Sequence, residues 1–289
     1  MTRISYCILF LSLFLLAACD SDKKVFMTPS PNESVLDVNV DVYLLNGKVL
    51  GKTQDVFLSD DILIEPLNDE FEKMRDNNEK FRIRFSEDIY YSVFYKILAT
   101  AAFWGIQPIR YTIGPNSSDV YTFDVQEKRR NVEWKDESAS FCFVILVERN
   151  ELVNVLESGN NDYFSNHELM NDTAYKSMKL KCNRNYMNLS VLFPVKNSES
   201  KYRVAFYETD SILPKVYDLK NEADLLDVLE SVRENENLQN KKDYDWINIF
   251  VRDSVDKVMT LNRVEPLIKI TAKLGYRMFF SHIVDGGLL

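Results

Sequence analysis

The feature that most restricts how this chain can fold is a pair of matching helical patterns, each of which ends at a glycine, Gly105 or Gly275. When the two glycines are aligned, the apolar residues before them also align, at the spacing that places side chains on one face of a helix. The matched pairs are Phe94 with Val264, Ile97 with Leu267, Leu98 with Ile268, Ala101 with Thr271, and Ala102 with Ala272. The match predicts an internal duplication. The alternative is a chance recurrence, because strands and helices alternate in many proteins.

Short strands and turns are predicted around both helical patterns. Alternating apolar and polar residues, apolar runs and the hairpin signal Asn46-Gly47 indicate where they lie. The expected strands are residues 35–42, 81–85, 109–113, 141–147, 189–193, 204–207, 246–251 and 278–282, and the expected helices are 63–74, 91–104, 219–233 and 264–274. We therefore expect an α+β protein with two small domains, each a mixed sheet with helices packed on one face.

The N-terminal segment has the layout of a targeting signal. Arg3 is the one charge in residues 1–18, and the apolar run from residue 8 to residue 16 is too short to span a membrane, which takes roughly 20 residues. The run ends in Leu16-Ala17-Ala18-Cys19, which resembles the lipobox of bacterial lipoproteins. The resemblance implies cleavage before Cys19 and lipid attachment to its thiol. An uncleaved anchor, or an ordinary secretory signal with a chance cysteine, is the alternative.

The resemblance also bears on location. It implies a chain held to a cell membrane by lipid and facing the periplasm, and Asp20 resembles an inner-membrane retention signal, although the outer membrane stays open. Residues 19–34 are polar and contain Pro29 and Pro31, which is typical of a tether. The expected organisation is a signal peptide (1–18), this tether, a first domain (35–118), a linker (119–139) and a second domain with insertions (140–289).

Charge and cysteine content restrict the partners. Removal of residues 1–18 takes away one arginine and no acid, so the formal charge goes from −9 to −10. The longest basic run is Lys128-Arg129-Arg130, so we expect neither nucleic acid nor an anionic bilayer surface as a partner. Cys7 lies in the signal, and Cys142 and Cys182 are left as a candidate disulfide. Equally, Cys142 is explained as a buried free thiol within an apolar run.

Few residues carry recognisable chemistry. The two histidines, His167 and His282, are far apart in sequence and lack neighbours at zinc-ligand spacing, so each is expected to be a surface or hydrogen-bonded histidine. The chain contains no glycine-rich phosphate loop, no Gly-x-Ser-x-Gly pattern and no calcium loop. We expect no metal and no cofactor. Carboxylates that the fold gathers for glycan hydrolysis stay open, since their spacing is spatial.

Residues 81–91, followed by an apolar helix to Trp104-Gly105, resemble the periplasmic domain of the ExbD/TolR biopolymer-transport proteins. Residues 247–254 and 264–275 are a looser match. The resemblance implies a small α+β binding module that dimerises and contacts envelope proteins or peptidoglycan. Tyr90 stands where the family commonly has proline, and the family's membrane helix with its aspartate is replaced here by the signal. The resemblance therefore covers the soluble domain and not energy coupling.

Five residues near the predicted helix starts are candidates for partner binding. Asp88 and Asp253 follow strands and precede helices, where a carboxylate commonly caps free backbone N–H groups. Tyr90, Tyr91 and Tyr95 are candidates because tyrosine is favoured at interfaces, whereas Phe94 and Phe103 are expected in the core.

Two functions follow from these observations. The first is a non-enzymatic, lipid-anchored binding or scaffold module of the cell envelope, accessory to an ExbB/ExbD- or TolQ/TolR-like system and able to form homo-oligomers. The alternative is a periplasm-facing hydrolase that acts on cell-wall material through carboxylates.

Overall fold

The computed structural model describes most of the chain after residue 32. The described residues are 33–77, 80–106, 109–114, 119–123, 156–157, 189–196, 198–208, 214–235, 245–253, 258–284 and 287–288. Contacts divide the chain into Met1–Asn32 and Glu33–Leu289, and every described residue belongs to the second unit. Among the candidate site residues and the histidines, Cys19, Asp20, Cys142, Cys182 and His167 lie outside the described ranges, and so does the strand expected over residues 141–147.

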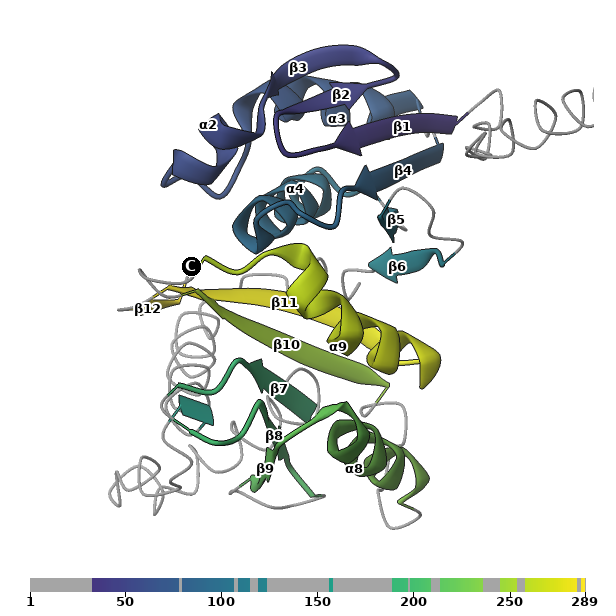
Figure 1. Ribbon diagram of the computed structural model, residues 1–289. Coiled ribbons are helices and arrows are strands. Elements are labelled where there is room, and N and C mark those ends of the chain that lie inside the picture. The colour runs from purple at the N-terminus through teal and green to yellow at the C-terminus, as the bar shows by residue number, and fades with distance from the viewer. Residues whose placement is uncertain are drawn as a thin grey trace, which may run out of the picture. The chain divides into compact units, whose positions relative to one another are not determined.

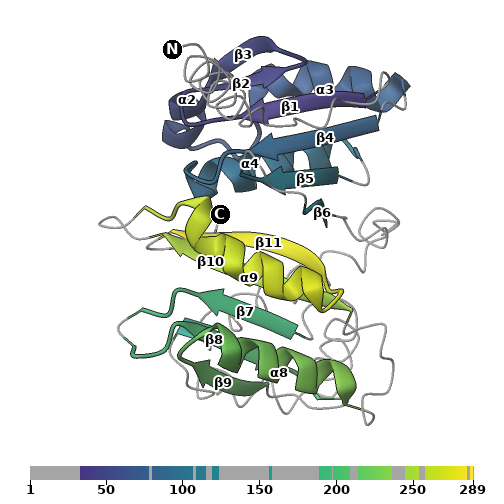
Figure 2. The same cartoon turned by 45° about the vertical axis from the view of Figure 1, so that its right-hand side comes forward.

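The protein is a mixed α/β structure built on one twelve-stranded sheet (Figure 1). Its strands are β1 (Glu33–Val38), β2 (Val42–Leu45), β3 (Lys48–Lys52), β4 (Lys80–Phe85), β5 (Ile109–Ile113), β6 (Tyr121–Phe123), β7 (Leu189–Phe193), β8 (Tyr202–Phe206), β9 (Lys215–Leu219), β10 (Trp246–Asp253), β11 (Arg277–Val284) and β12 (Gly287–Leu288). The order is β3-β2-β1-β4-β5-β6-β11-β10-β7-β8-β9 (Figure 2). In addition, β12 pairs with β11. The expected two separate sheets are not seen, because β6 pairs in parallel with β11 and joins them.

The order of strand pairings is the same on the two sides of that join. In the first half β2 is antiparallel to β1 and β3, β4 is parallel to β1 and β5, and β6 is antiparallel to β5. In the second half β8 is antiparallel to β7 and β9, β10 is parallel to β7 and β11, and β12 is antiparallel to β11. Each half therefore uses six strands in one pattern.

Five described helices cover one face of the sheet: α2 (Thr53–Leu58), α3 (Glu65–Asn77), α4 (Tyr91–Phe103), α8 (Glu222–Glu234) and α9 (Leu261–Lys273). Ring contacts show which face this is, because Phe81 of β4 packs on Phe71 of α3 and Phe85 of β4 packs on Phe94 of α4. One apolar cluster runs through both halves beneath these helices.

The predicted glycine ends of the two central helices are confirmed. Gly105 and Gly275 have φ of +75° and +74°, a conformation that costs glycine little and other residues more. In each case the glycine N–H and the N–H that follows bond back to the last turn, Gly105 to Ala102 and Gly275 to Ala272 at 3.0 and 2.9 Å. This arrangement satisfies carbonyl groups that a helix end leaves free.

Several expected boundaries are corrected. The strand predicted over residues 35–42 ends at Val38, because the Asn39 side chain accepts from the N–H groups of Asp41 and Val42 and turns the chain into β2. Leu219 belongs to β9 and not to the following helix, which begins after Asn221, whose side chain accepts from the Asp224 N–H.

Two further segments differ from expectation. The last helix begins at Leu261, one turn before the predicted residue 264. Within the segment expected to be a linker, Tyr121–Phe123 forms β6 and takes part in the sheet.

Candidate functional site

The starts of α4 and α9 meet at a contact that we call the helix junction, formed by residues 87–91 and 259–262. Tyr90 and Thr260 precede the two helices and form an isolated antiparallel bridge. Tyr91 N–H donates to the Met259 carbonyl at 2.8 Å, and Leu261 N–H donates to the Ile89 carbonyl at 2.9 Å. Each helix thus has its first backbone N–H bonded by the loop of the other half.

Side chains at the surface of the junction also join the two halves. The Asn262 amide donates to Asp88 Oδ1 at 3.3 Å, and the Asn262 backbone N–H donates to the Glu87 carbonyl at 2.7 Å. Tyr90 packs against Phe57 of α2 with ring centroids 4.3 Å apart. Asp88 is exposed and Tyr90 is half-buried, so both can be reached from solvent.

A buried histidine–aspartate pair lies beneath the junction. His282 Nε2 is 2.8 Å from Asp253 Oδ2, and Asp253 Oδ1 accepts from the Met259 N–H. The 2.8 Å distance is that of a hydrogen bond in which Nε2–H donates to the carboxylate. His282 is 3% exposed, and its Nδ1 has no hydrogen-bond partner among the described residues. Asp253 therefore holds Met259 in place, and the Met259 carbonyl accepts from the Tyr91 N–H at the start of α4.

Two tyrosines of α4 enclose this pair. The rings of Tyr91 and Tyr95 lie 5.7 and 6.0 Å from the His282 ring, and the Tyr91 hydroxyl donates to the Ser281 carbonyl at 3.4 Å. Complete burial raises the pKa of the Tyr91 phenol well above its usual value, and the neighbouring Tyr95, Tyr111 and Asp253 add to that effect. Tyr91 is therefore a neutral interior side chain.

The structure brings all five candidate partner-binding residues to one region but changes the roles of some. Tyr91 is fully buried and Asp253 is 8% exposed, so neither presents a surface to a partner in this structure. Asp88, Tyr90 and Tyr95 keep exposed atoms.

The expected capping role is corrected for both aspartates. The residues at the cap positions, Tyr90 and Thr260, make no side-chain hydrogen bond to the helix starts. Backbone carbonyls of the junction bond the first N–H of each helix instead. Asp253 instead accepts from the backbone N–H of Met259, two residues before α9 begins.

Two aromatic residues expected in the core differ in outcome. Phe94 is fully buried, whereas Phe103 is 65% exposed and packs edge-on against Trp104 with ring centroids 5.5 Å apart. The prediction for Phe103 is wrong because it lies nine residues after Phe94, which is half a turn out of phase at 3.6 residues per turn.

Sequence reasoning missed the contribution of His282. Val251 and His282 are Cα partners in the parallel register of β10 and β11, which brings His282 close to Asp253 two residues further along β10. Nothing in the local sequence gives that register, so the pair has no signal in the sequence alone.

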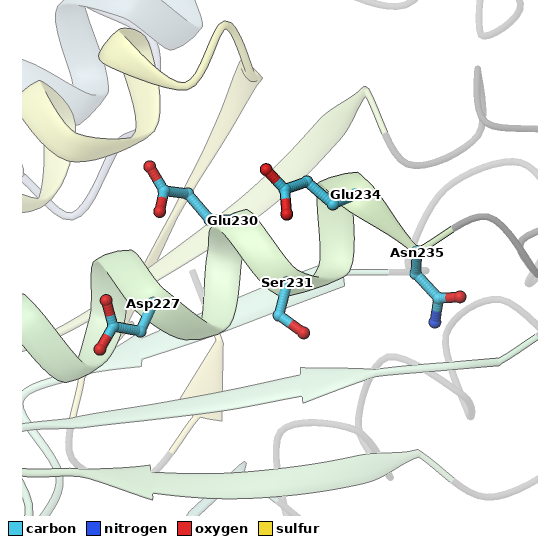
Figure 3. Close-up of a pocket in the computed structure, with 5 residues that line it drawn as sticks. All are labelled: Asp227, Glu230, Ser231, Glu234 and Asn235. Carbon is cyan, nitrogen blue, oxygen red and sulfur yellow. The ribbon is translucent and has the colours of Figure 1, made fainter.

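Other parts of the described chain are weaker candidates for a functional site. An open hollow of about 380 Å³ along α8 is lined by Asp227, Glu230, Ser231, Glu234 and Asn235 (Figure 3). Three carboxylates along one helix are typical of a solvated face. Within the described ranges no group of three or more histidine, cysteine or acidic side chains is arranged to hold a metal, and no helix there is long and apolar enough to cross a membrane.

Comparison of the chain with protein-family models, with curated proteins and with solved structures finds no match.

Proposed function

We propose that this chain is a lipid-anchored binding module of the cell envelope, in which two repeats of one ancestral domain form a built-in dimer. The repeats are residues 33–123 and 189–288. The support is the recurrence of six strands and two helices in the same order with the same pairings.

The observation that carries the proposal is the helix junction. Tyr90 and Thr260 are 170 residues apart, as are Gly105 and Gly275, so the bridge joins two positions that are equivalent under the repeat. Contact between a position and its own equivalent is what a two-fold axis between two copies produces. A fused pair of repeats in one chain thus has the contact expected of a symmetric dimer.

A binding role is supported by what the junction exposes. Asp88, Tyr90 and Tyr95 lie at or beside the start of α4, with Tyr91, Asp253 and His282 packed beneath them. Tyrosine with one polar end at the surface is enriched in protein interfaces. The His–Asp pair supports this surface from below, and with His282 3% and Asp253 8% exposed it presents little surface to a substrate. We therefore favour the non-enzymatic role over the hydrolase.

The anchor and the partner class are proposed from sequence. The pattern Leu16-Ala17-Ala18-Cys19 supports lipidation of Cys19, and Asp20 supports retention at the inner membrane, facing the periplasm. The ExbD/TolR-like residues 81–91 support an envelope protein or peptidoglycan as the partner.

Two experiments test the proposal. Mass analysis of the mature N-terminus, with and without the lipoprotein signal-peptidase inhibitor globomycin, is expected to show a diacylated Cys19 that is lost in Cys19→Ala. A photoreactive amino acid at position 88 or 95 in living cells is expected to give discrete crosslinked products.

The matched control places the same photoreactive group at Tyr217, an exposed aromatic residue of β9 at the sheet edge. Products from positions 88 and 95 but not from 217 support the junction as the binding surface. Equal yields from all three positions, or none from any, contradict it, and an unmodified Cys19 contradicts the anchor.

A further inference from the structure

The face of the sheet opposite the five described helices carries several arginines in the first half. Phe81, Ile83 and Phe85 of β4 point toward the helices, and since side chains alternate along a strand, Arg82 and Arg84 point away. The same alternation in β5 puts Arg110 on that face, between Ile109 and Tyr111. We call the three residues Arg82, Arg84 and Arg110 the arginine face.

The second half shows what arginines on this side of the sheet bind. Arg203 of β8 donates through Nη1 to the carbonyl oxygens of Leu156 and Glu157 at 2.9 and 3.0 Å. Arg252 of β10 pairs with the Glu157 carboxylate. Both arginine side chains are buried, 6% and 7% exposed. Here two arginines hold a chain segment through its carbonyl groups and one acidic side chain.

An arginine–aspartate pair in the first half repeats the geometry seen in the second. Arg203 binds Asp218 on the neighbouring strand with Nε and Nη2 at 2.5 and 3.0 Å. Arg84 binds Asp37 on the neighbouring strand through the same two nitrogens at 2.5 and 2.7 Å. The difference is exposure, because the Arg84 side chain is 32% exposed. The arginine is therefore covered in the second half and one-third exposed in the first, whereas the aspartate is partly exposed in both pairs.

Arg82 and Arg110 add positive charge that is only partly balanced. They are Cα partners in the register of β4 and β5, and like charges directly opposite on neighbouring strands destabilise a sheet. Glu33 pairs with Arg82 at 3.2 Å, but the buried Arg82 Nε has no partner among the described residues. Arg110 is exposed. A carboxylate placed between these two guanidinium groups would relieve their repulsion.

We propose that the arginine face is a docking surface for an acidic segment of a protein partner, which lies across β4 and β5 and places a carboxylate between Arg82 and Arg110. The inference rests on the proposed binding function and names the chemistry of the partner. Charge complementarity and the segment held by Arg203 and Arg252 select this occupant.

The test uses the whole lipid-anchored chain in detergent micelles and a fluorescent peptide of glycine, serine and glutamate. Fluorescence anisotropy is expected to show binding that is lost when glutamine replaces the glutamates. Arg110→Gln is expected to weaken binding about fivefold to tenfold, the effect of one charge-assisted hydrogen bond. Arg263→Gln, which removes the same charge from the exposed side of α9 on the helix-covered face, is the matched control and is expected to change binding less than about twofold, because screening weakens distant charges.

Three outcomes overturn the inference. Equal losses in Arg110→Gln and Arg263→Gln would make the effect one of net charge, and equal binding of the two peptides would remove the role of carboxylates. Arg110-dependent binding to phosphatidylglycerol vesicles, without peptide binding, would assign the face to lipid instead.

Crosslinking in cells separates this inference from the proposed function. A photoreactive group at Thr122, the exposed Cα partner of Arg110 on β6, is expected to capture peptides rich in aspartate and glutamate. If position 95 gives products but position 122 captures no acidic peptides, the binding function is supported and the arginine face is not a docking surface. If neither position gives products, both the binding function and the arginine face are contradicted.

Discussion

Asp253 satisfies two buried donors at once, the Met259 N–H and His282 Nε2. Asp253→Ala leaves both donors without an acceptor, so we expect the free energy of unfolding to fall by about 3 kcal/mol. Asp253→Asn keeps one acceptor oxygen, so we expect about half that loss. Urea unfolding followed by circular dichroism measures both. Equal losses below about 1 kcal/mol in the two variants would show that the pair does not stabilise the junction.

At the residue scale, periodicity predicts burial better than residue type does. Phe94 is buried as its helical spacing predicts, and Tyr91, three residues earlier, shares its face and is buried too. Residue type alone predicts a partner contact for Tyr91 and burial for Phe103, although the phase of Phe103 along the helix points outward. The pairing of His282 with Asp253 depends on strand register, which residue spacing does not encode.

At the element scale, the two glycine helix ends were predictable because a left-handed residue after a helix leaves a clear signal. Apolar patterns in the sequence also predict seven of the described strands, β1, β4, β5, β7, β8, β10 and β11, but they do not predict β9 or β12. The joining of the halves into one sheet was not predictable, because it depends on β6, three residues in a segment without strand periodicity. The contact between α4 and α9 was equally hidden, since it uses backbone groups that every residue has.

Gly275→Ala is expected to lower the free energy of unfolding by about 1 to 2 kcal/mol, because φ of +74° strains a residue with a Cβ. The new methyl group would also lie 3.4 Å from Arg233 Nη2. Gly47→Ala, at φ +83° with nothing within 4 Å, isolates the strain alone. Thermal unfolding compares the two variants. A loss in Gly47→Ala with none in Gly275→Ala would contradict the helix-end geometry described here.

The two backbone bonds of the helix junction are expected to open together. Hydrogen exchange of the Tyr91 and Leu261 amides should report the same opening free energy, because their acceptors, Met259 and Ile89, lie on the two strands of one bridge. Asp253→Asn should accelerate both exchanges by the same factor. The Leu225 amide in the first turn of α8 is the control and should not change. Fast exchange at Tyr91 with slow exchange at Leu261 would show that the halves are not joined as one unit there.

At the scale of the whole molecule, aromatic side chains fill the contact between the halves. Phe280 of β11 packs against Phe94, Phe123 and Tyr111 of the first half, with ring centroids 5.2, 5.9 and 6.5 Å apart. Such pairs add about 0.5 to 1.5 kcal/mol each beyond area burial. The crowd of aromatic residues on one helix, which suggested an interface with a partner, therefore serves in large part as an interface within the chain.

The same buried tyrosines make stability sensitive to alkaline pH. Burial raises the pKa of Tyr91 and Tyr111 well above the usual 10 and raises the pKa of Tyr121 and Tyr276 to about 12. Because the folded pKa exceeds the unfolded one, stability is complete below pH 10 and is lost as the pH rises. Above pH 10, each of these tyrosines lowers the free energy of unfolding by about 1.4 kcal/mol per pH unit. Together the four can therefore offset a total stability of about 5 to 15 kcal/mol near pH 11 to 12.

We expect tyrosinate absorbance and the loss of circular dichroism to rise together in one transition, because most of these phenols ionise only when the chain unfolds. Tyr111→Phe removes a hydroxyl without a described partner, so it should leave stability at pH 7 unchanged and move the transition to higher pH. Tyr276→Phe removes the 2.8 Å bond to the Leu229 carbonyl and should lower stability at pH 7 by about 1 kcal/mol. Ionisation of nearly all tyrosines near pH 10 with the circular dichroism intact would contradict their burial, and with it the packing of the two halves through this aromatic contact.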